Sequence, residues 1–202
     1  MDPDMTSLTN DLLQQLQGQP MAQLSQRLGL SPEQTSGAVS AALPLLMGAL
    51  GRNASQPQGA QQLLGALQRD HSGLDLGSVL GAVMSGGGSG GDILGHVLGA
   101  RQQTAAQGLG AATGLDGDRA GALLKMLAPL VMAFLAKQMS GGGADATPQA
   151  LGGLLGQEQQ QIRQQGGIGG GLLGAVLDQD GDGVTGLSDL LKIGGSLFGG
   201  KR

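Results

Sequence analysis

Four carboxylates near the C-terminus have a spacing that suits a metal ion. Asp178, Asp180 and Asp182 alternate in "LDQDGDGVTGLSDLL", and Asp189 closes a window of twelve residues. The whole chain has only 15 Asp and Glu residues among 202, so this window is a marked local concentration of acid. Alternate side chains in a tight coil converge on one point, and calcium takes about six to eight oxygen ligands. Without a cation, the carboxylates would repel one another.

The other positions of this window supply the turn and the remaining ligands. Gly183 stands sixth, where a sharp turn is needed, and Gly186 stands ninth, where water would take the place of a side chain. Thr185 stands eighth, where an apolar residue is usual, and no second acidic loop is present to pair with this one. The predicted metal ligands are the side chains of Asp178, Asp180, Asp182 and Asp189 and the backbone carbonyl of Val184.

The window resembles the calcium loops of EF-hand and dockerin proteins, the latter commonly with Asp at the twelfth position. The resemblance implies Ca²⁺ as the ligand. A single loop with a short twelfth side chain should bind weakly, with a Kd of roughly 10⁻⁵–10⁻³ M, so Mg²⁺ could compete. We expect a structural ion, because the methionine-rich groove of a sensor has no counterpart here. The alternative is a solvated acidic turn in which Asp189 caps the last helix.

Composition predicts an all-α protein with a thin aliphatic core. Glycine contributes 41 residues, apolar residues make up 40 %, and Phe134 and Phe198 are the only aromatic side chains. Strand signals are weak, with little alternation and few β-branched residues. The net charge of −4 argues against nucleic acid, because phosphate binding needs clustered cations. There is no cysteine, and the N-terminus does not read as a secretory signal. We expect a cytoplasmic protein.

The chain repeats itself. Gly29–Asn53 aligns without a gap on Gly114–Gln138, 85 positions later. This predicts a tandem duplication of one multi-helix unit, with a first repeat over 8–91 and a second over 92–202 that ends in the calcium-type loop 178–189. Both main helices contain a proline, Pro44 and Pro129, which should kink or break them.

Start signals and apolar spacing predict the helices. Ser31 and Asp116 are expected to cap the two main helices. Further helices are predicted over Leu8–Leu16, Met21–Leu28, Ala60–Arg69, Leu76–Met84, Asp92–Gln103, Gln107–Ala112, Pro148–Gln164 and Gly169–Leu177. "SGGGSGG" between the repeats favours a flexible hinge.

These features together resemble the YidB-like family. The residues that carry the resemblance are "LGL" before a capped helix, the prolines in "ALPLLMGAL" and "LAPLVMAFL", and "DQDGDG" near the C-terminus, within Leu8–Gly200. The resemblance implies a bacterial source and an all-helical fold. The family has no established activity, so it implies no catalytic residues.

The sequence favours a non-enzymatic binding or scaffold protein, with apolar helix faces that could recruit a second copy or a protein partner. His71 and His96 read as surface residues, because neither has an orienting partner at a catalytic spacing. Met21–Leu43 looks like a helix-turn-helix, but its second helix is apolar from Ala38 to Leu50, which argues against DNA binding. The alternatives are an enzyme with an unrecognised site and a membrane-associated protein that inserts Ala120–Ala136; the central Lys125 makes insertion the weaker interpretation.

Overall fold

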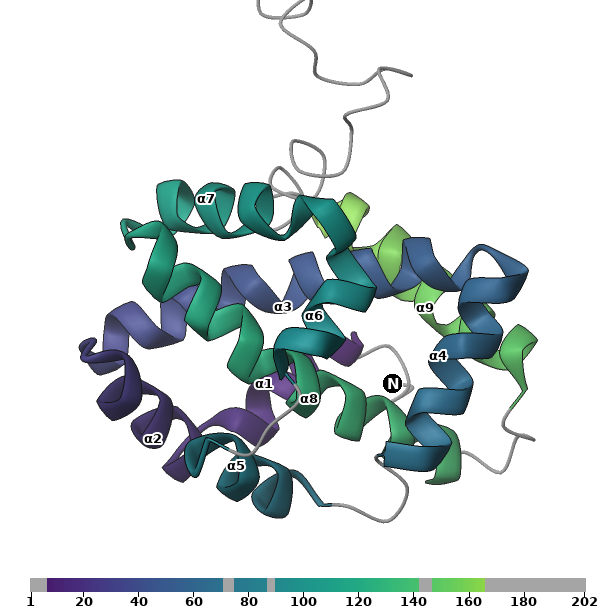
Figure 1. Cartoon of the computed structure of the whole chain (residues 1–202), viewed down its shortest axis with the longest axis horizontal. Coiled ribbons are helices and arrows are strands. Elements are labelled where there is room, and N and C mark those ends of the chain that lie inside the picture. Colours follow the sequence, from purple (N-terminus) through teal and green to yellow (C-terminus); the bar gives the residue numbers. More distant parts are fainter. Residues whose placement is uncertain (1–6, 71–74, 87–89, 142–146, 166–202) are drawn as a thin grey trace, which may run out of the picture.

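The computed structural model describes residues 7–70, 75–86, 90–141 and 147–165, and every regular element in these ranges is helical (Figure 1). The prediction of an all-α fold is therefore confirmed for the part of the chain that is described. In chain order the elements are α1 (Leu8–Leu16), α2 (Gln19–Leu28), α3 (Pro32–Ala54), α4 (Pro57–Asp70), α5 (Leu76–Met84), α6 (Gly90–Leu98), the 3₁₀ turn η2 (Gly99–Arg101), α7 (Gln102–Thr113), α8 (Gly117–Gly141) and α9 (Pro148–Gln165).

The predicted caps begin both long helices. The Ser31 hydroxyl accepts a hydrogen bond from the Gln34 N–H (3.2 Å), and the Gln34 side chain accepts one from the Ser31 N–H (3.1 Å). This reciprocal pair satisfies two donors that the start of α3 would otherwise leave open. At the start of α8, the Asp116 carboxylate accepts from the Arg119 N–H (2.8 Å). Asp75 caps α5 in the same way, and its hydrogen bonds with the side chain and backbone of Ser78 lower its pKa.

The turns that lead into α3 and α8 share one geometry. Gly29 ends α2 with φ +63°, and Gly114 ends α7 with φ +73°. In both turns, the N–H of the residue after the glycine bonds at 3.0 Å to a carbonyl five residues earlier. Such a turn favours glycine because other residues are strained at positive φ. The two glycines stand at the 85-residue offset of the aligned segments. A common origin by duplication stays a prediction.

The two long helices lie at the centre of the molecule. α3 packs against α8 and α9, while α5, α6 and α7 pack against α8 (Figure 1). The buried residues form one continuous apolar cluster, mostly Leu, Ala and Met, in which Phe134 is the only aromatic side chain that the structure describes. Residues from both predicted repeats contribute to this cluster, so they share one core.

The internal prolines do not interrupt their helices. Pro44 lies within α3 and Pro129 within α8, and both helices continue for ten residues or more beyond them. The two helices are therefore not broken at these prolines, and the predicted kink stays a prediction. A proline lacks the N–H that would bond to the carbonyl four residues earlier, which leaves the Lys125 carbonyl without its helical partner. The first residue of α6, Gly90, lies directly against this carbonyl: a Cβ on Gly90 would stand 2.0 Å from its oxygen.

One helix boundary differs clearly from the prediction. The helix expected over Asp92–Gln103 ends at Leu98, because Gly99 takes a φ of +55° and η2 follows. α7 then begins at Gln102, five residues before its predicted start. The remaining predicted helices agree with the structure to within three residues at each end. The helix predicted over Gly169–Leu177 lies outside the described residues, and the expected repeat boundary after residue 91 falls inside α6.

Candidate functional site

The predicted metal ligands cannot be placed, because Asp178, Asp180, Asp182, Val184 and Asp189 all lie outside the described residues. Within the described ranges, no group of three or more His, Cys, Asp or Glu side chains could hold a metal ion. The candidate site that the structure does show is a cavity elsewhere in the chain.

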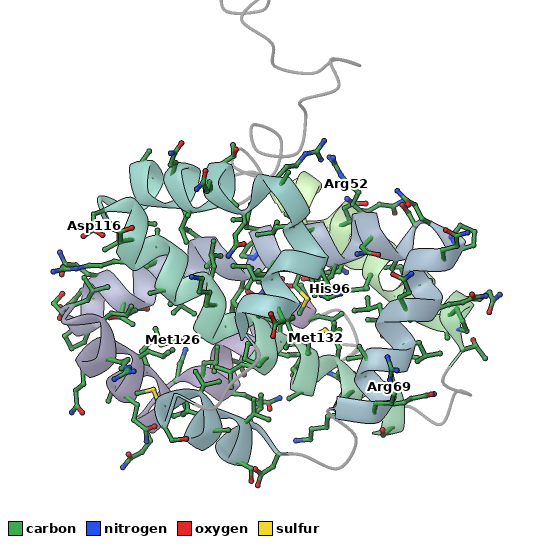
Figure 2. All side chains as sticks on the ribbon, viewed as in Figure 1. Arg52, Arg69, His96, Asp116, Met126 and Met132 are labelled. Atoms are coloured by element: carbon green, nitrogen blue, oxygen red, sulfur yellow. The ribbon has the colours of Figure 1, made fainter. Side chains whose placement is uncertain are left out.

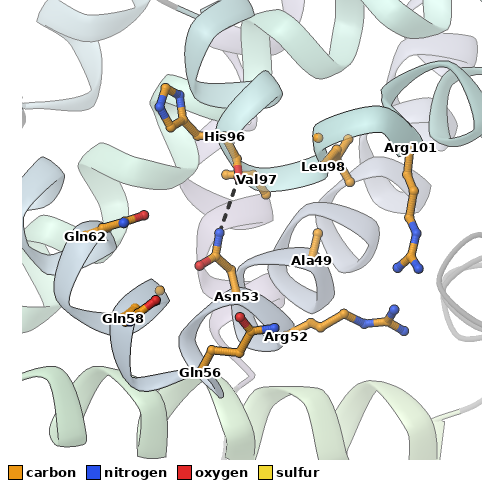
Figure 3. Close-up of a pocket in the computed structure, with 12 residues that line it drawn as sticks. Ala49, Arg52, Asn53, Gln56, Gln58, Gln62, His96, Val97, Leu98 and Arg101 are labelled. Atoms are coloured by element: carbon orange, nitrogen blue, oxygen red, sulfur yellow. Dashed lines mark hydrogen bonds between the residues drawn. The ribbon is translucent and has the colours of Figure 1, made fainter.

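This cavity, here called the arginine cleft, lies where the end of α3, the start of α4, the end of α6 and η2 meet (Figure 3). Its volume is about 370 Å³. Arg52 and Arg101 are both half-buried, and Figure 3 shows their guanidinium groups on the same side of the cavity. Polar side chains complete the lining: Asn53, Gln56, Gln58, Gln62 and His96.

Close packing between α3 and α4 positions the cleft. The Gln56 N–H donates to the Asn53 carbonyl (3.2 Å), which turns the chain sharply between the two helices. Gly59 lies so close that a Cβ there would stand 2.1 Å from the same carbonyl oxygen. The Asn53 side-chain amide donates to the His96 carbonyl (3.3 Å) and so connects α3 to the end of α6 (Figure 3). This cluster of short contacts holds the two sides of the cleft together.

The orientation of His96 follows from its one hydrogen bond to the backbone. The His96 Nδ1 lies 2.8 Å from the Asp92 carbonyl oxygen. A carbonyl oxygen only accepts, so Nδ1 carries the proton and Nε2 is the acceptor in the neutral ring. The ring is exposed, as predicted for a surface histidine.

The described residues that line the cleft include two cations, although the protein as a whole is acidic. None of the described residues that line it is Asp or Glu, whereas two are arginines. The first turn of α4 also lines the cleft, through Gln58 and Gly59, and the N-terminus of a helix carries partial positive charge. Half-buried charges act through a lower effective dielectric than water, so they attract an anion more strongly than exposed ones. The cleft is suited to anions with several oxygen acceptors.

Sequence reasoning did not identify this cleft. Neither Arg52 nor Arg101 is among the site residues predicted from the sequence. The lining comes from two stretches, 49–62 and 96–101, and no local motif signals their meeting. A cationic residue at each of two helix ends was the only available hint.

Two of the interpretations weighed on the sequence can be compared with the structure. In the described part, one helix, Gly117–Ser140 with mean hydropathy 1.6, is long and apolar enough to cross a membrane. A buried core helix of a water-soluble protein can have the same length and hydropathy. In Gly117–Ser140, 78 % of the apolar window is buried inside the molecule. The second helix of the helix-turn-helix pattern is α3, and its residues from Ala38 to Leu50 are buried apart from Ser40 and Pro44.

Fold and site therefore define an all-helical protein with a buried central pair of helices and a cationic surface cleft. Residues 10–138 match the family described as "Bacterial protein of unknown function (DUF937)". The match covers more than half of the chain, which therefore belongs to this family. It extends from α1 to α8 and leaves α9 outside. No curated protein and no solved structure is significantly similar to the chain.

Proposed function

We propose that the protein is a non-enzymatic binding protein that takes a small anionic ligand in the arginine cleft. The observation that carries this proposal is that two half-buried guanidinium groups, those of Arg52 and Arg101, line one cavity beside the first turn of α4. Guanidinium groups bind carboxylate and phosphate oxygens through paired, charge-assisted hydrogen bonds. Each has five N–H donors, so it can bond to more than one group at once.

The amide side chains add donors and acceptors for a polar ligand. Gln58 and Gln62 of α4 are exposed on the side of the cleft opposite the arginines, and the exposed Gln56 lies near Arg52 (Figure 3). They carry no charge that would oppose an anion. A scaffold role through the apolar faces of α3 and α8 has less support, because both helices use these faces in the core. A protein partner would have to bind elsewhere on the surface.

Loss of either cleft arginine should weaken anion binding. The probes are inorganic phosphate and pyrophosphate, titrated into the full chain in a calorimeter at low salt. A charge-assisted hydrogen bond contributes about 1.5–3 kcal/mol, so Arg52→Gln or Arg101→Gln should lower affinity about tenfold or more. Binding should also weaken as salt rises, because the attraction is electrostatic.

The control for this experiment is Arg119→Gln. Arg119 is an exposed cation on α8 that pairs with Asp116 at 3.3 Å and does not line the cleft. The Arg119→Gln substitution removes the same charge from the molecule and should leave the affinity for phosphate and pyrophosphate nearly unchanged. If phosphate and pyrophosphate give no heat, or if all three variants behave alike, the cleft is not an anion site.

We also propose, from the sequence alone, that the window Asp178–Asp189 binds Ca²⁺ as a structural ion. Three alternating aspartates, a turn glycine and a twelfth-position acid form a specific combination. Such an ion would stabilise the folded protein by an amount that grows with the logarithm of the free ion concentration above Kd.

Calcium should therefore raise the midpoint of thermal unfolding. At a hundredfold excess over Kd, the gain in stability would be about 2.7 kcal/mol. The variant Asp178→Ala/Asp182→Ala should lose this response to millimolar CaCl₂. A charge-matched control, Glu33→Ala/Asp118→Ala, changes two exposed acids in the first turns of α3 and α8 and should keep it. Identical melting curves with CaCl₂ and with a chelator would end the metal hypothesis.

A further inference from the structure

The groove between α4 and α6 leaves part of an apolar surface uncovered. This α4–α6 groove has a volume of about 420 Å³, and its most deeply buried lining residues include Met132 of α8, at 2 % exposure, and Leu63 of α4, at 6 %. Ala66 of α4 and Ile93 and Val97 of α6 also line it and are only half-buried, although each packs against the core. A small apolar group that covers these side chains would leave water, which favours its binding.

Two side chains of opposite charge line the same groove. Arg69 lies in the last turn of α4 and Asp92 in the first turn of α6, and both are exposed. Figure 2 labels Arg69 together with His96 of α6 and Met132 of α8, which also line the groove. Neither Arg69 nor Asp92 forms an ion pair with the other or with any further residue in the part of the chain that the structure describes. Both charges are therefore available to a ligand.

A hydrogen bond along α4 holds the Arg69 guanidinium in place. Its Nε donates to the Gly65 carbonyl (3.1 Å), so the group lies back over the preceding turn of the helix. Gly65 has no side chain in the way, and the Arg69 Nη2 lies 3.8 Å from the place that a Cβ would take there. This bond uses one of the five N–H donors of the guanidinium. The four donors that remain on the two Nη atoms suit a carboxylate, which guanidinium groups bind through paired hydrogen bonds.

The α6 side of the groove offers acceptors. The Asp92 carboxylate has two acceptor oxygens, and the neutral His96 ring offers Nε2, because its Nδ1 donates to the Asp92 carbonyl (2.8 Å). An ammonium group has three N–H donors and no acceptor. This side of the groove therefore suits a cationic amine, whereas the Arg69 side suits a carboxylate.

We propose that the α4–α6 groove binds a small zwitterion with an apolar side chain, of the class of the free hydrophobic amino acids. Arg69 binds the carboxylate, Asp92 binds the ammonium group, and the apolar side chain lies against Met132 and Ile93. A ligand with one charge would leave either Arg69 or Asp92 without a partner and would be repelled by the other. A volume of about 420 Å³ is within the range of small-molecule sites. Neither arginine of the cleft takes part, so this site is independent of the anion site proposed above.

The test is a titration of four probes into the full chain, followed by the NMR shifts of the Ile93 and Val97 amides. The probes are leucine, isocaproate, isoamylamine and glycine. Isocaproate is leucine without its ammonium group, isoamylamine is leucine without its carboxylate, and glycine is an amino acid without an apolar side chain. Leucine should bind about tenfold or more tighter than each of the other three, because each lacks one of the three contacts.

Matched variants locate the two charges. Arg69→Gln and Asp92→Asn should each weaken leucine binding about tenfold or more. Their controls are Arg27→Gln, an exposed cation in the last turn of α2, and Asp118→Asn, an exposed acid in the first turn of α8. Neither control residue lines the groove, so both variants should bind leucine as the wild type does. All four residues are exposed, and circular dichroism checks that each variant folds.

Several results would overturn the inference. Equal affinities for leucine and glycine would remove the apolar contact, and equal affinities for leucine and isocaproate would remove the role of Asp92. Absence of any shift with leucine up to its solubility would reject the site. A loss of leucine binding in Arg101→Gln as large as in Arg69→Gln would place the carboxylate in the arginine cleft. If Arg101→Gln abolishes pyrophosphate binding and leaves leucine binding unchanged, the two sites are separate, as proposed.

Discussion

Replacing Gly90 with alanine should destabilise the protein by about 1–3 kcal/mol, the usual cost of overpacking. A Cβ at this position would stand 2.0 Å from the Lys125 carbonyl oxygen and 3.0 Å from its carbonyl carbon. Both atoms belong to the backbone of α8, a helix that is buried along most of its length, so neither can rotate away. α6 would have to move off α8, and core contacts of Leu94 would be lost with it. Urea unfolding followed by circular dichroism measures the change.

The neighbouring glycine is the matched control. Gly91 is exposed in the same helix, and a Cβ there would meet nothing within 4 Å. Because alanine is a better helix former, Gly91→Ala should stabilise the protein by about 0.5–1 kcal/mol. The two substitutions add the same methyl group to adjacent residues and should act in opposite directions. If both variants unfold at the same urea concentration, the contact of Gly90 with Lys125 is not as close as the structure has it.

The close contact at Gly90 shows how far the sequence could predict this fold. From Pro129 the sequence predicts a kink or break, because the carbonyl four residues earlier has no helical partner. It could not predict which glycine of "SGGGSGG" would lie against that carbonyl, because all are equivalent in local preference. Local signals succeeded elsewhere: the caps at Ser31 and Asp116 depend on residues three positions apart and were predicted correctly.

The candidate site could not be predicted for the same physical reason. Arg52 and Arg101 are far apart in the chain, and whether they line the same cavity depends on how α6 packs on α8 and how Gly99 ends α6. Within an apolar run, the sequence does not distinguish a glycine with positive φ, such as Gly99, from a glycine inside a helix. The acidic window differs from the cleft, because the spacing of its residues alone predicts calcium binding. This prediction stays untested because the window lies outside the described residues.

A buried carboxylate on α9 leads to the second large prediction. Glu158 is 3 % exposed and is the only ionisable side chain that the structure describes as buried. Its carboxylate accepts hydrogen bonds from the N–H groups of Leu8 (2.9 Å) and Thr9 (3.0 Å) and from the Thr9 hydroxyl. These backbone donors belong to the first turn of α1, where helical N–H groups have no partner and negative charge is favoured. α9 thus caps a helix 150 residues away.

Glu158→Ala should lower the free energy of unfolding by about 1–3 kcal/mol, because the buried Thr9 N–H loses its acceptor. Glu158→Gln should lower it less, since the amide keeps one acceptor oxygen. The exposed residue Gln160, on the same helix, supplies the control: Gln160→Ala should change stability by no more than about 0.5 kcal/mol. Urea unfolding measures all three variants.

The part of the protein that loses stability in the Glu158 variants distinguishes a cap on α1 from general weakening of α9. Thr9→Val removes the hydroxyl donor to Glu158, so its effect should shrink in the Glu158→Ala background. Amide hydrogen exchange should quicken first at Leu8 and Thr9, the two backbone donors of the contact. The family match ends at residue 138, before α9. If exchange at α1 stays as in the wild type, the helix beyond the family match does not secure the N-terminus of the fold.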